Sequence, residues 1–487
     1  MAWVHDSIFK DCDIRGVFGT ELSPDAAYRV ARALGVKLAG KRVVVGGDVR
    51  VHTRLLQNRV TQALQSSGCH VLDLGCVPTP AFRFAIAELH ADGGVMVTGS
   101  HNKPEYNGLK LVLGPVPLVR EDFEEIRQMV ERQEETSGEG SIGTVSLVHN
   151  YQAQMIRRFS PGGALKVVID CGNGCYSKIA PEVFDKLGYR LVELFCEPDG
   201  TFPNRDPNPA IPAHLSALTA AVLESGADLG IAFDGDGDRV AFTDENGSVI
   251  PAEHVLVLLA RRLLKRDSLA SVVCDVKASM VVEEEVLRLG CIFIEEKSGH
   301  SYIRRRMILD QADLGGEVSG HFFFRSLNGS DDGLYSSLLV AQIVEQSGHS
   351  LATLTRGLAR HQITPDLRLP FDLKEAQHLV MRLRDFFARE RLSILDGVKV
   401  YFDDGWGLLR PSVTEPAITL RFEATSPSHT ADIALRFLEP VKEILPLLQQ
   451  NYPEWFPTAK KEGAASHPPS ESEKPPGSPR GKKAAQD

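Results

Sequence analysis

Up to about residue 366, short apolar runs alternate with amphipathic segments. Each run is rich in β-branched residues and ends near a Gly or Asp, which is typical of buried strands followed by helices. The runs predict strands at 42–46, 70–75 and 94–98, at 166–170, 190–194 and 229–233, and at 271–275, 291–295 and 314–317. A helix is predicted near 53–67. The rhythm therefore predicts three copies of one α/β unit, alike in pattern rather than in sequence.

The rhythm changes after residue 366. Helical stretches at 373–391 and 428–444 enclose apolar runs that predict strands, so this part is expected to form a smaller α+β domain. The strands are predicted at 397–402, 406–410 and 417–424. The predicted units are 1–145, 146–249, 250–362 and 363–457, with links at 137–144, near 247–252 and near 360–366. Residues 458–487 are rich in Pro, Ser, Lys and Glu and are predicted to be a disordered tail.

Composition argues against several classes of partner. The formal net charge of −10 disfavours general nucleic-acid binding, and no apolar run approaches the length of a membrane-spanning helix. The N-terminus lacks the basic-then-apolar order of a signal peptide. The 8 cysteines include no CxxC pair, which fits reduced thiols better than a disulfide framework. We expect a cytoplasmic protein that binds neither nucleic acid nor membrane.

Three acids follow the buried run Leu229 to Phe233 at alternate positions, in the sequence Asp234-Gly235-Asp236-Gly237-Asp238-Arg239. The glycines permit a tight turn, so the three carboxylates can converge, and their repulsion favours a cation among them. Oxygen ligands suit Mg²⁺. A polar turn is the plain alternative. An EF-hand loop is disfavoured because Arg239 stands where that loop needs glycine. We therefore predict a Mg²⁺ site that, with Arg239, faces a phosphate.

Three polar loops, at 98–104, 234–239 and 316–321, each follow the last predicted strand of a repeat. Ligands gather at the carboxyl ends of strands in open α/β sheets, so the three repeats are expected to share one site. In the first loop, Ser100 stands beside His101 and could be a nucleophile, with Lys110 nearby in the sequence. A loop that hydrogen-bonds its own backbone is the alternative.

Two further loops have the composition of ligand-binding segments. Glu317, Ser319 and His321 lie on a glycine-rich loop whose carboxylate could accept hydrogen bonds from vicinal sugar hydroxyls, although a polar turn is equally compatible. The segment 410–416, with an Arg and two hydroxyls and with Arg421 beyond it, could be a phosphate cradle or a solvated hairpin.

Together these loops resemble the α-D-phosphohexomutase family over residues 7–445, most closely its bacterial phosphomannomutase/phosphoglucomutase branch. Four loops stand in the family's order and spacing: 98–102 matches its phosphoserine loop, 234–239 its metal loop, 316–321 its sugar loop and 410–416 its phosphate loop. Asp13-Ile14-Arg15-Gly16 resembles its opening motif. The resemblance implies three tandem similar α/β domains with mixed sheets plus a smaller C-terminal α+β domain, around a central cleft.

The resemblance also implies an activity. The family interconverts hexose 6-phosphates and hexose 1-phosphates, here of mannose, glucose or both, through a phosphoserine and a 1,6-bisphosphosugar. It implies one Mg²⁺ per chain, a hexose 1,6-bisphosphate as phosphorylating activator, a small phosphosugar as partner, and a monomer or weak homodimer. The implied catalytic residues are Ser100, His101, Lys110, Arg15 and Arg239, and the metal ligands are Ser100, Asp234, Asp236 and Asp238. The implied substrate contacts are Lys277, His300, Glu317, Ser319, His321, Arg410, Ser412, Val413, Thr414 and Arg421.

Two rival functions remain open. A phosphoglucosamine mutase shares the Gly-Glu-x-Ser-Gly-His loop, whereas the run Asp404-Gly405-Trp406 ahead of Arg410 favours the mannose/glucose branch. An inactive sugar-phosphate-binding homologue is disfavoured by the intact Ser100 and the three acids. Val413 stands where the family usually has Gly or Asn, which bears on the affinity of the phosphate loop.

Overall fold

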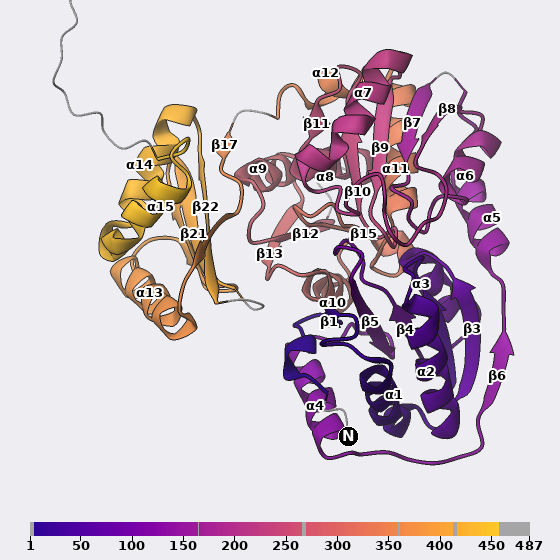
Figure 1. Cartoon of the computed structure of the whole chain (residues 1–487). Helices are drawn as coiled ribbons and strands as arrows, with labels where there is room; N and C mark the ends of the chain where they lie inside the picture. The colour runs from indigo at the N-terminus through magenta and orange to yellow at the C-terminus, as the bar shows by residue number, and fades with distance from the viewer. Residues whose placement is uncertain (1–3, 164, 265–268, 359–360, 413–415, 457–487) are drawn as a thin grey trace, which may run out of the picture.

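The computed structural model describes residues 4–163, 165–264, 269–358, 361–412 and 416–456, and arranges them in four domains (Figure 1). The first domain has a six-stranded sheet in the order β1-β5-β4-β2-β3-β6. Strand β5 is antiparallel to its neighbours β1 and β4, and the other pairings are parallel. The elements are β1 (Ile14–Val17), α1 (Pro24–Leu38), β2 (Arg42–Gly47), α2 (Thr53–Ser66), β3 (His70–Cys76), α3 (Thr79–Glu88), β4 (Gly93–Val97), β5 (Tyr106–Leu113), α4 (Arg120–Glu131) and β6 (Ser141–Thr144).

The second and third domains repeat one sheet topology. Their orders are β11-β10-β9-β7-β8 and β16-β15-β14-β12-β13. In each sheet the last three strands of this order are parallel to one another, and the first two pair antiparallel. The second contains α5 (Val148–Arg158), β7 (Lys166–Asp170), α6 (Ala180–Lys186), β8 (Arg190–Leu194), α7 (Ser216–Ser225), β9 (Leu229–Phe233), β10 (Val240–Thr243) and β11 (Val249–Ile250). The third contains α8 (Ala252–Leu263), β12 (Ser271–Asp275), α9 (Met280–Arg288), β13 (Ile292–Glu296), α10 (His300–Asp310), β14 (Leu314–Gly316), β15 (Phe322–Phe324), β16 (Ser330–Asp331), α11 (Gly333–Ser347) and α12 (Leu351–Thr355).

The fourth domain is an antiparallel sheet in the order β17-β22-β21-β20-β19, with β18 also paired to β22. Its elements are β17 (Gln362–Ile363), β18 (Leu367–Pro370), α13 (Leu373–Phe386), β19 (Leu392–Ser393), β20 (Val398–Phe402), β21 (Gly405–Pro411), β22 (Ala417–Ala424), α14 (Pro427–Phe437) and α15 (Leu445–Asn451). The predicted fold class, three similar α/β domains with mixed sheets plus a smaller α+β domain, is confirmed.

Apolar burial joins the first three domains and leaves the fourth separate. One continuous cluster contains Phe82 from the first domain, Phe233 from the second and Leu338 from the third. The fourth domain has its own core, which includes Leu409 and Phe422. A small cluster of Val276, Trp406 and Leu408 connects the third domain to the fourth. The fourth domain therefore docks on a body that the other three form together.

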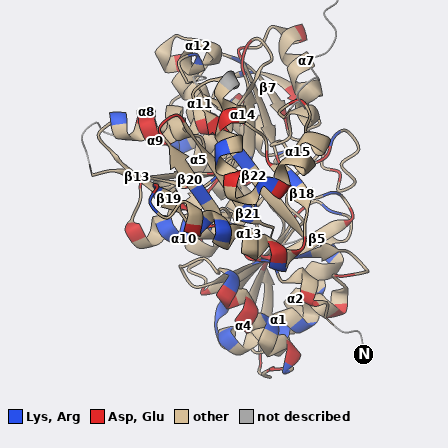
Figure 2. Ribbon diagram, turned by 90° about the vertical axis from the view of Figure 1, so that its left-hand side faces the viewer, with Lys and Arg blue, Asp and Glu red and all other residues tan. Residues whose placement is uncertain are grey.

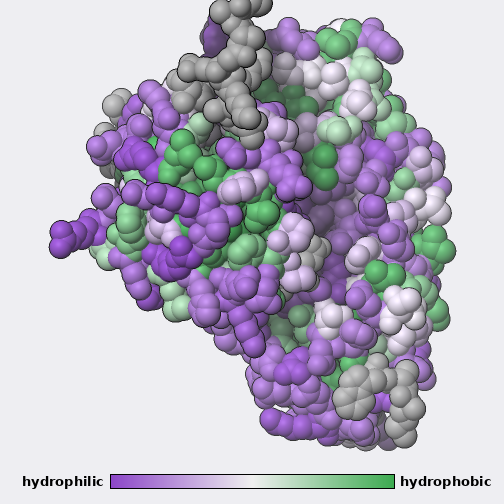
Figure 3. All heavy atoms as spheres, turned by 60° about the vertical axis from the view of Figure 1, so that its left-hand side comes forward, coloured by the Kyte–Doolittle hydropathy of each residue, from purple (hydrophilic) through white to green (hydrophobic). Residues whose placement is uncertain are grey.

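Basic and acidic residues are interspersed along the ribbon (Figure 2). The side facing the fourth domain is hollowed, and hydrophilic residues predominate in the hollow (Figure 3). A cleft of about 1120 Å³ lies here, lined by residues of the second, third and fourth domains, among them Arg239, Ser319 and Arg421. Within the described part of the chain, no helix is long and apolar enough to cross a membrane.

Candidate active site

The acidic loop leaves the end of β9 and is fully enclosed. Asp234, Asp236 and Asp238 are at most 1% exposed, and one oxygen from each lies within 4.8 Å of the other two. The Asp234 Oδ1 accepts hydrogen bonds from the backbone N–H groups of Gly237 and Arg239 at 2.8 and 3.1 Å. The sequence folds locally in this way because Gly237 adopts φ +82°, which L residues rarely adopt.

Lys110, on β5 of the first domain, reaches the acids of the second. Its Nζ donates to Asp236 Oδ2 at 2.7 Å and also to Asp238 Oδ2. The Oδ1 atoms of Asp236 and Asp238 are buried and accept no hydrogen bond from the described residues. Buried carboxylate oxygens are expensive without a partner, so this donor set fits a hard divalent cation such as Mg²⁺.

The three acids do not titrate alike. Burial raises the pKa of Asp234 well above its ordinary value, and the charges of Asp236 and Asp238 add to the effect. Burial acts in the same direction on Asp238, but Lys110, Arg83 and Arg239 outweigh it and lower the pKa of that carboxyl. The neighbouring cations therefore compensate the charge of Asp238 more than that of Asp234.

Ser100 lies directly against this acidic loop. Its Oγ is 3.3 Å from Asp234 Oδ2 and 3.2 Å from His101 Nδ1, and the residue is 2% exposed. Its backbone has φ +49°, an uncommon value for a residue other than glycine. The structure thus brings together the serine and the acids predicted to form one centre.

A buried ion pair holds the serine loop in place. Arg50 pairs with Asp48 at 3.1 Å, and both side chains have zero exposure. Arg50 also donates to the backbone carbonyls of Ser100 at 2.9 Å and Tyr106 at 3.0 Å, while Asp48 accepts from the Gly99 N–H and the Thr98 hydroxyl. These bonds fix the loop on both sides of the serine.

Two glycines allow the loops to approach so closely. A Cβ at Gly99 would stand 2.5 Å from Arg50 Nε, and one at Gly235 would stand 2.6 Å from the Ser100 carbonyl oxygen. Neither distance is compatible with a side chain. The glycines are therefore required by contact between the loops, beyond their freedom to turn.

Two arginines, Arg15 and Arg239, act on the loop that carries the serine. Arg15 pairs with Asp13 and donates to Asn102 Oδ1 at 2.6 Å. Burial, followed by the charges of Arg239 and Arg15, lowers the pKa of His101 well below its ordinary value. His101 is therefore neutral at neutral pH.

The third-domain loop lies across from the acids. The Glu317 Oε1 accepts from the Gly299 N–H at 2.8 Å, and the Ser319 hydroxyl lies 3.5 Å from Glu317 Oε2. The Arg239 Nε donates to His321 Nε2 at 2.9 Å, so the second and third domains are joined here by a hydrogen bond. The His300 and His321 rings lie 5.7 Å apart, and burial lowers the pKa of both well below the ordinary value.

The predicted phosphate-binding residues of the third and fourth domains make no hydrogen bond to Ser100 within the described part of the chain. Lys277 pairs with Asp366 at 3.0 Å, and Arg410 lies 3.2 Å from Asp396. Arg421 lines the cleft but already donates to the carbonyls of Thr364 at 3.1 Å and Lys277 at 2.8 Å. The Ser412 N–H closes the hairpin onto the Ala417 carbonyl at 2.7 Å. The predicted contacts Val413 and Thr414 lie outside the described residues.

Sequence reasoning missed the residues that support the site. Asp48 and Arg50 follow a predicted strand, a position that could have marked them, but nothing in the sequence ties them to Ser100. The Thr79 hydroxyl, which donates to Asp236 Oδ2 at 2.6 Å, and Asp331, which lies 2.7 Å from His321 Nδ1, carry no motif at all. Such partners become visible only when the domains are in contact.

Comparison with known proteins agrees with the fold. The chain matches four domains of phosphoglucomutase/phosphomannomutase: alpha/beta/alpha domain I at residues 6–137, domain II at 147–247, domain III at 251–361 and the C-terminal domain at 368–439. It is 36% identical over 450 residues to a phosphomannomutase/phosphoglucomutase of Pseudomonas putida, covering 91% of this chain and 97% of the relative. It is 35% identical over 447 residues to a phosphoglucomutase of Neisseria gonorrhoeae, covering 90% and 97%.

A solved structure gives the same result. The crystal structure of a phosphoglucomutase/phosphomannomutase family protein from Burkholderia thailandensis superposes with a TM-score of 0.84 at 34% identity. The alignment covers 90% of this chain and 98% of that one. With all four domains matched in order and relatives 36% identical over most of the chain, this chain belongs to the phosphoglucomutase/phosphomannomutase family of phosphohexomutases.

Proposed function

We propose that this enzyme interconverts hexose 6-phosphates and hexose 1-phosphates of mannose, glucose or both, through a phosphoserine at Ser100 and a 1,6-bisphosphosugar. The observation that carries the proposal is the contact of Ser100 Oγ with Asp234, at 3.3 Å, inside a buried acidic centre. We further propose units at 1–145, 146–249, 250–362 and 363–457, and the four matched family domains fall within them.

The acids and the serine are proposed to hold one Mg²⁺. The ligands would be Asp234, Asp236, Asp238 and an oxygen of the phosphorylated Ser100, and the ion would withdraw charge from the phosphoryl group. The fit rests on the buried Oδ1 atoms of Asp236 and Asp238, which lack hydrogen bonds from the described residues. A hexose 1,6-bisphosphate is proposed to phosphorylate Ser100 initially.

The transfer breaks the bond between Ser100 Oγ and phosphorus and forms one between phosphorus and the free hydroxyl of the sugar phosphate. The proton of that hydroxyl must leave, and Ser100 Oγ must gain one. His101, neutral and 3.2 Å from Ser100 Oγ, suits proton transfer at the serine. Lys110 is more suited to holding charge, because Asp236 and Asp238 raise its pKa against the opposing effect of burial. Arg15 and Arg239 are proposed to steady the transferring group.

The sugar is proposed to lie across the cleft. The Glu317 carboxylate would accept hydrogen bonds from its 3- and 4-hydroxyls, and the Ser319 hydroxyl would donate to them. His300 and His321 would lie beside these groups. Its phosphate would dock near Lys277, Arg410, Ser412, Val413, Thr414 and Arg421. Because this cradle would grip a phosphate and two hydroxyls, the bisphosphosugar can turn and present its other phosphate to Ser100.

Replacement of Ser100 by alanine tests the proposal. The parent protein is expected to be one phosphate heavier than its sequence by intact mass. Ser100→Ala should lose that phosphate together with nearly all mutase activity, because the covalent route is removed. Ser137→Ala, a change at an exposed serine, is the matched control and should keep both. Parental activity in Ser100→Ala would refute the assignment.

A phosphoglucosamine mutase is the second candidate, because it shares the loop of Glu317, Ser319 and His321. Rates with mannose 1-phosphate, glucose 1-phosphate and glucosamine 1-phosphate, measured side by side, distinguish the two. Faster turnover of the amino sugar would favour the second candidate. No turnover of any of the three would favour a sugar-phosphate-binding homologue.

A further inference from the structure

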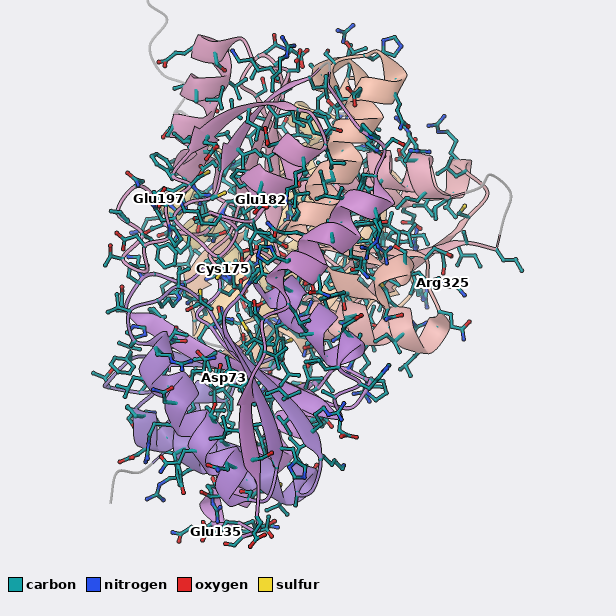
Figure 4. All side chains as sticks on the ribbon, turned by 90° about the vertical axis from the view of Figure 1, so that its right-hand side faces the viewer. Asp73, Glu135, Cys175, Glu182, Glu197 and Arg325 are labelled. Atoms are coloured by element: carbon teal, nitrogen blue, oxygen red, sulfur yellow. The ribbon has the colours of Figure 1, made fainter. Side chains whose placement is uncertain are left out.

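A second cavity, of about 970 Å³, lies between α3, α5, α10 and the segment after β15. It shares no lining residue with the cleft beside the fourth domain, and Ser100 and Glu317 do not line it. Figure 4 views the molecule from the side opposite to the fourth domain, with Arg325, one of the lining residues, labelled on the third domain. We call this space the rear cavity.

The rear cavity has an excess of unpaired positive charge. Four arginines line it: Arg83, Arg158, Arg304 and Arg325. The guanidinium of Arg304 has no ion pair or hydrogen bond among the described residues, and its Nε is buried. Within the described ranges, the Arg158 guanidinium contacts the Ser326 carbonyl at 3.4 Å and the ring of Tyr335 at 5.9 Å, and no carboxylate. Both guanidiniums therefore face the cavity without a carboxylate.

The acids that line the cavity are already engaged. Asp92 accepts from the Arg42 N–H at 3.0 Å. Asp332 accepts from the Tyr151 and Tyr176 hydroxyls at 2.8 and 3.0 Å and caps α11. Asp331 pairs with Arg83 and His321. These acids cannot neutralise Arg304 and Arg158 without giving up their own partners.

Two helices connect the acidic centre to the rear cavity. Helix α3 begins at Thr79, which donates to Asp236, and Arg83 follows one turn later. Helix α10 begins at His300, beside His321, and Arg304 follows one turn later. Residues four apart lie on the same face of a helix, and Arg83 and Arg304 both line the rear cavity. Burial, followed by the charge of Arg83, lowers the pKa of Arg304 to about 9.

We propose that the rear cavity is a second anion site, which binds a phosphoryl dianion at Arg304 with Arg158 and Arg83 on its walls. Guanidinium groups bind phosphate oxygens in pairs, and such charge-assisted bonds are strongest where water is excluded. Inorganic phosphate and the phosphate of a sugar monophosphate share this chemistry, and the volume admits either.

The site is connected to the acidic centre through three contacts. Arg83 pairs with Asp331, Asp331 lies 2.7 Å from His321 Nδ1, and His321 Nε2 accepts from Arg239 Nε at 2.9 Å. An anion that draws Arg83 away from Asp331 changes what His321 and Arg239 contact. Occupancy of the rear cavity therefore modulates the active site, which is a coupling between two distinct sites.

Calorimetric titration of the full chain tests the proposal, with inorganic phosphate and glucose 1-phosphate in separate arms. The parent should bind inorganic phosphate at two sites, and Arg304→Gln should weaken one of them roughly tenfold or more. The matched control is Arg306→Gln on the same helix, since Arg306 pairs with Asp310 at 2.6 Å and does not line the cavity. Unchanged phosphate binding in a folded Arg304→Gln protein would overturn the proposal. A response to only one of the two ligands identifies the source of the phosphoryl group.

A second variant and a crystallographic experiment keep the proposal testable if Arg304→Gln fails to fold. Arg158 is exposed, so Arg158→Gln should fold and should also weaken the second phosphate site. Crystals soaked with tungstate should show anomalous density beside Arg304, and density confined to the cleft at Ser100 would contradict the proposal. Inorganic phosphate is not a substrate of the proposed reaction, so failure in that arm would leave the proposed function untouched.

Discussion

Ser100 is held more by its backbone than by its side chain. Arg50 donates to the carbonyls of Ser100, Lys103 and Tyr106, and these bonds set the left-handed conformation that aims Oγ at Asp234. Arg50 and Asp48 are fully buried, so the arrangement excludes water. Strain of this kind persists only where the surroundings over-determine the conformation, as they do here.

Gly99→Ala should displace Ser100 indirectly, through Arg50. The new methyl would collide with Arg50 Nε and Cζ, which stand 2.5 and 2.6 Å from the Cβ position, and displacement of the guanidinium would release the loop. We expect a loss of about 1–3 kcal/mol in the free energy of unfolding and a fall in kcat larger than any change in KM. Chemical denaturation and steady-state kinetics measure the two effects.

Gly143→Ala is the control for that change. Its added Cβ would meet only Leu72 Cδ2, at an ordinary 3.6 Å, so stability and kinetics should stay at parental values. Equal behaviour of the two variants would show that the contact between Gly99 and Arg50 does not support the loop.

Among the elements, buried strands were the most predictable from sequence. The predictions 166–170, 229–233, 271–275 and 417–424 coincide with observed strands whose residues are almost all buried, and 190–194 coincides with an observed strand that is only partly buried. Short edge strands lack this signal. The predicted link 137–144 contains β6, which pairs with β3 although all four of its residues are at least partly exposed.

The two long helices of the fourth domain were predicted too long. The stretch 373–391 ends as a helix at Phe386, and Leu392 and Ser393 pair with β20 as a strand. The stretch 428–444 ends as an α-helix at Phe437, and a 3-10 turn with Pro440 follows. Strand pairing ends the first helix and a proline follows the end of the second. The apolar periodicity of the sequence extends beyond both ends and therefore predicted longer helices.

The candidate site was predictable as loops but not as contacts. Glycine spacing and clustered charge marked the loops at Ser100, Asp234 and Glu317. The supporting side chains Arg50 and Asp331 lie on other elements and make contacts that depend on domain packing. Their roles can be assigned only from the folded arrangement of the domains.

One acid on β13 fastens the fourth domain to the third. Glu295 accepts from Lys399 Nζ at 2.9 Å and from the Tyr401 hydroxyl, both on β20, and Lys399 is 5% exposed at its side chain. Removing one partner of a buried pair leaves the other charge unsatisfied. Glu295→Gln should therefore lower the unfolding temperature of the fourth domain, at a cost of about 3 kcal/mol, and calorimetry should resolve it from the rest.

Glu283→Gln is the matched control at the same junction. Glu283 accepts from Arg391 at 2.7 Å, but the Arg391 side chain is 62% exposed, so its loss should cost less than about 1 kcal/mol. A fourth-domain transition that shifts equally in both variants would contradict the distinction.

The same junction should weaken in acid. Burial alone would raise the pKa of Glu295, but Lys399 and the Tyr401 hydroxyl outweigh it and lower that pKa below the ordinary glutamate value. The stabilisation is then complete above the ordinary pKa and is lost as the pH falls through the lowered one. The fourth-domain transition of the parent should move down below about pH 4, and that of Glu295→Gln should move less.

In the whole molecule, one apolar cluster spans the first three domains, which meet at the acidic centre, so a ligand there should stabilise all three together. Removal of divalent cations should lower their common transition, and Mg²⁺ at 100 times its Kd should restore about 2.7 kcal/mol. Asp234→Asn removes one of three repelling charges, so it should raise the stability of the cation-free protein and reduce the Mg²⁺ increment. Thermal unfolding with and without chelator measures both.

Asp385→Asn is the control, because Asp385 is exposed and pairs only with its neighbour Arg384 among the described residues. It should leave both transitions and the Mg²⁺ increment as in the parent. A Mg²⁺ effect that survives unchanged in Asp234→Asn would place the ion elsewhere.

The bond from Lys110 to Asp236 and Asp238 spans 126 and 128 residues of sequence. During synthesis the ribosome delivers the lysine first, on a domain that can fold before the acids emerge. Lys110 is therefore already in position when the second domain folds. Its positive charge can reduce the repulsion among the three carboxylates before any metal ion binds. Ligand capture, in contrast, must wait until the third-domain loop has left the exit tunnel.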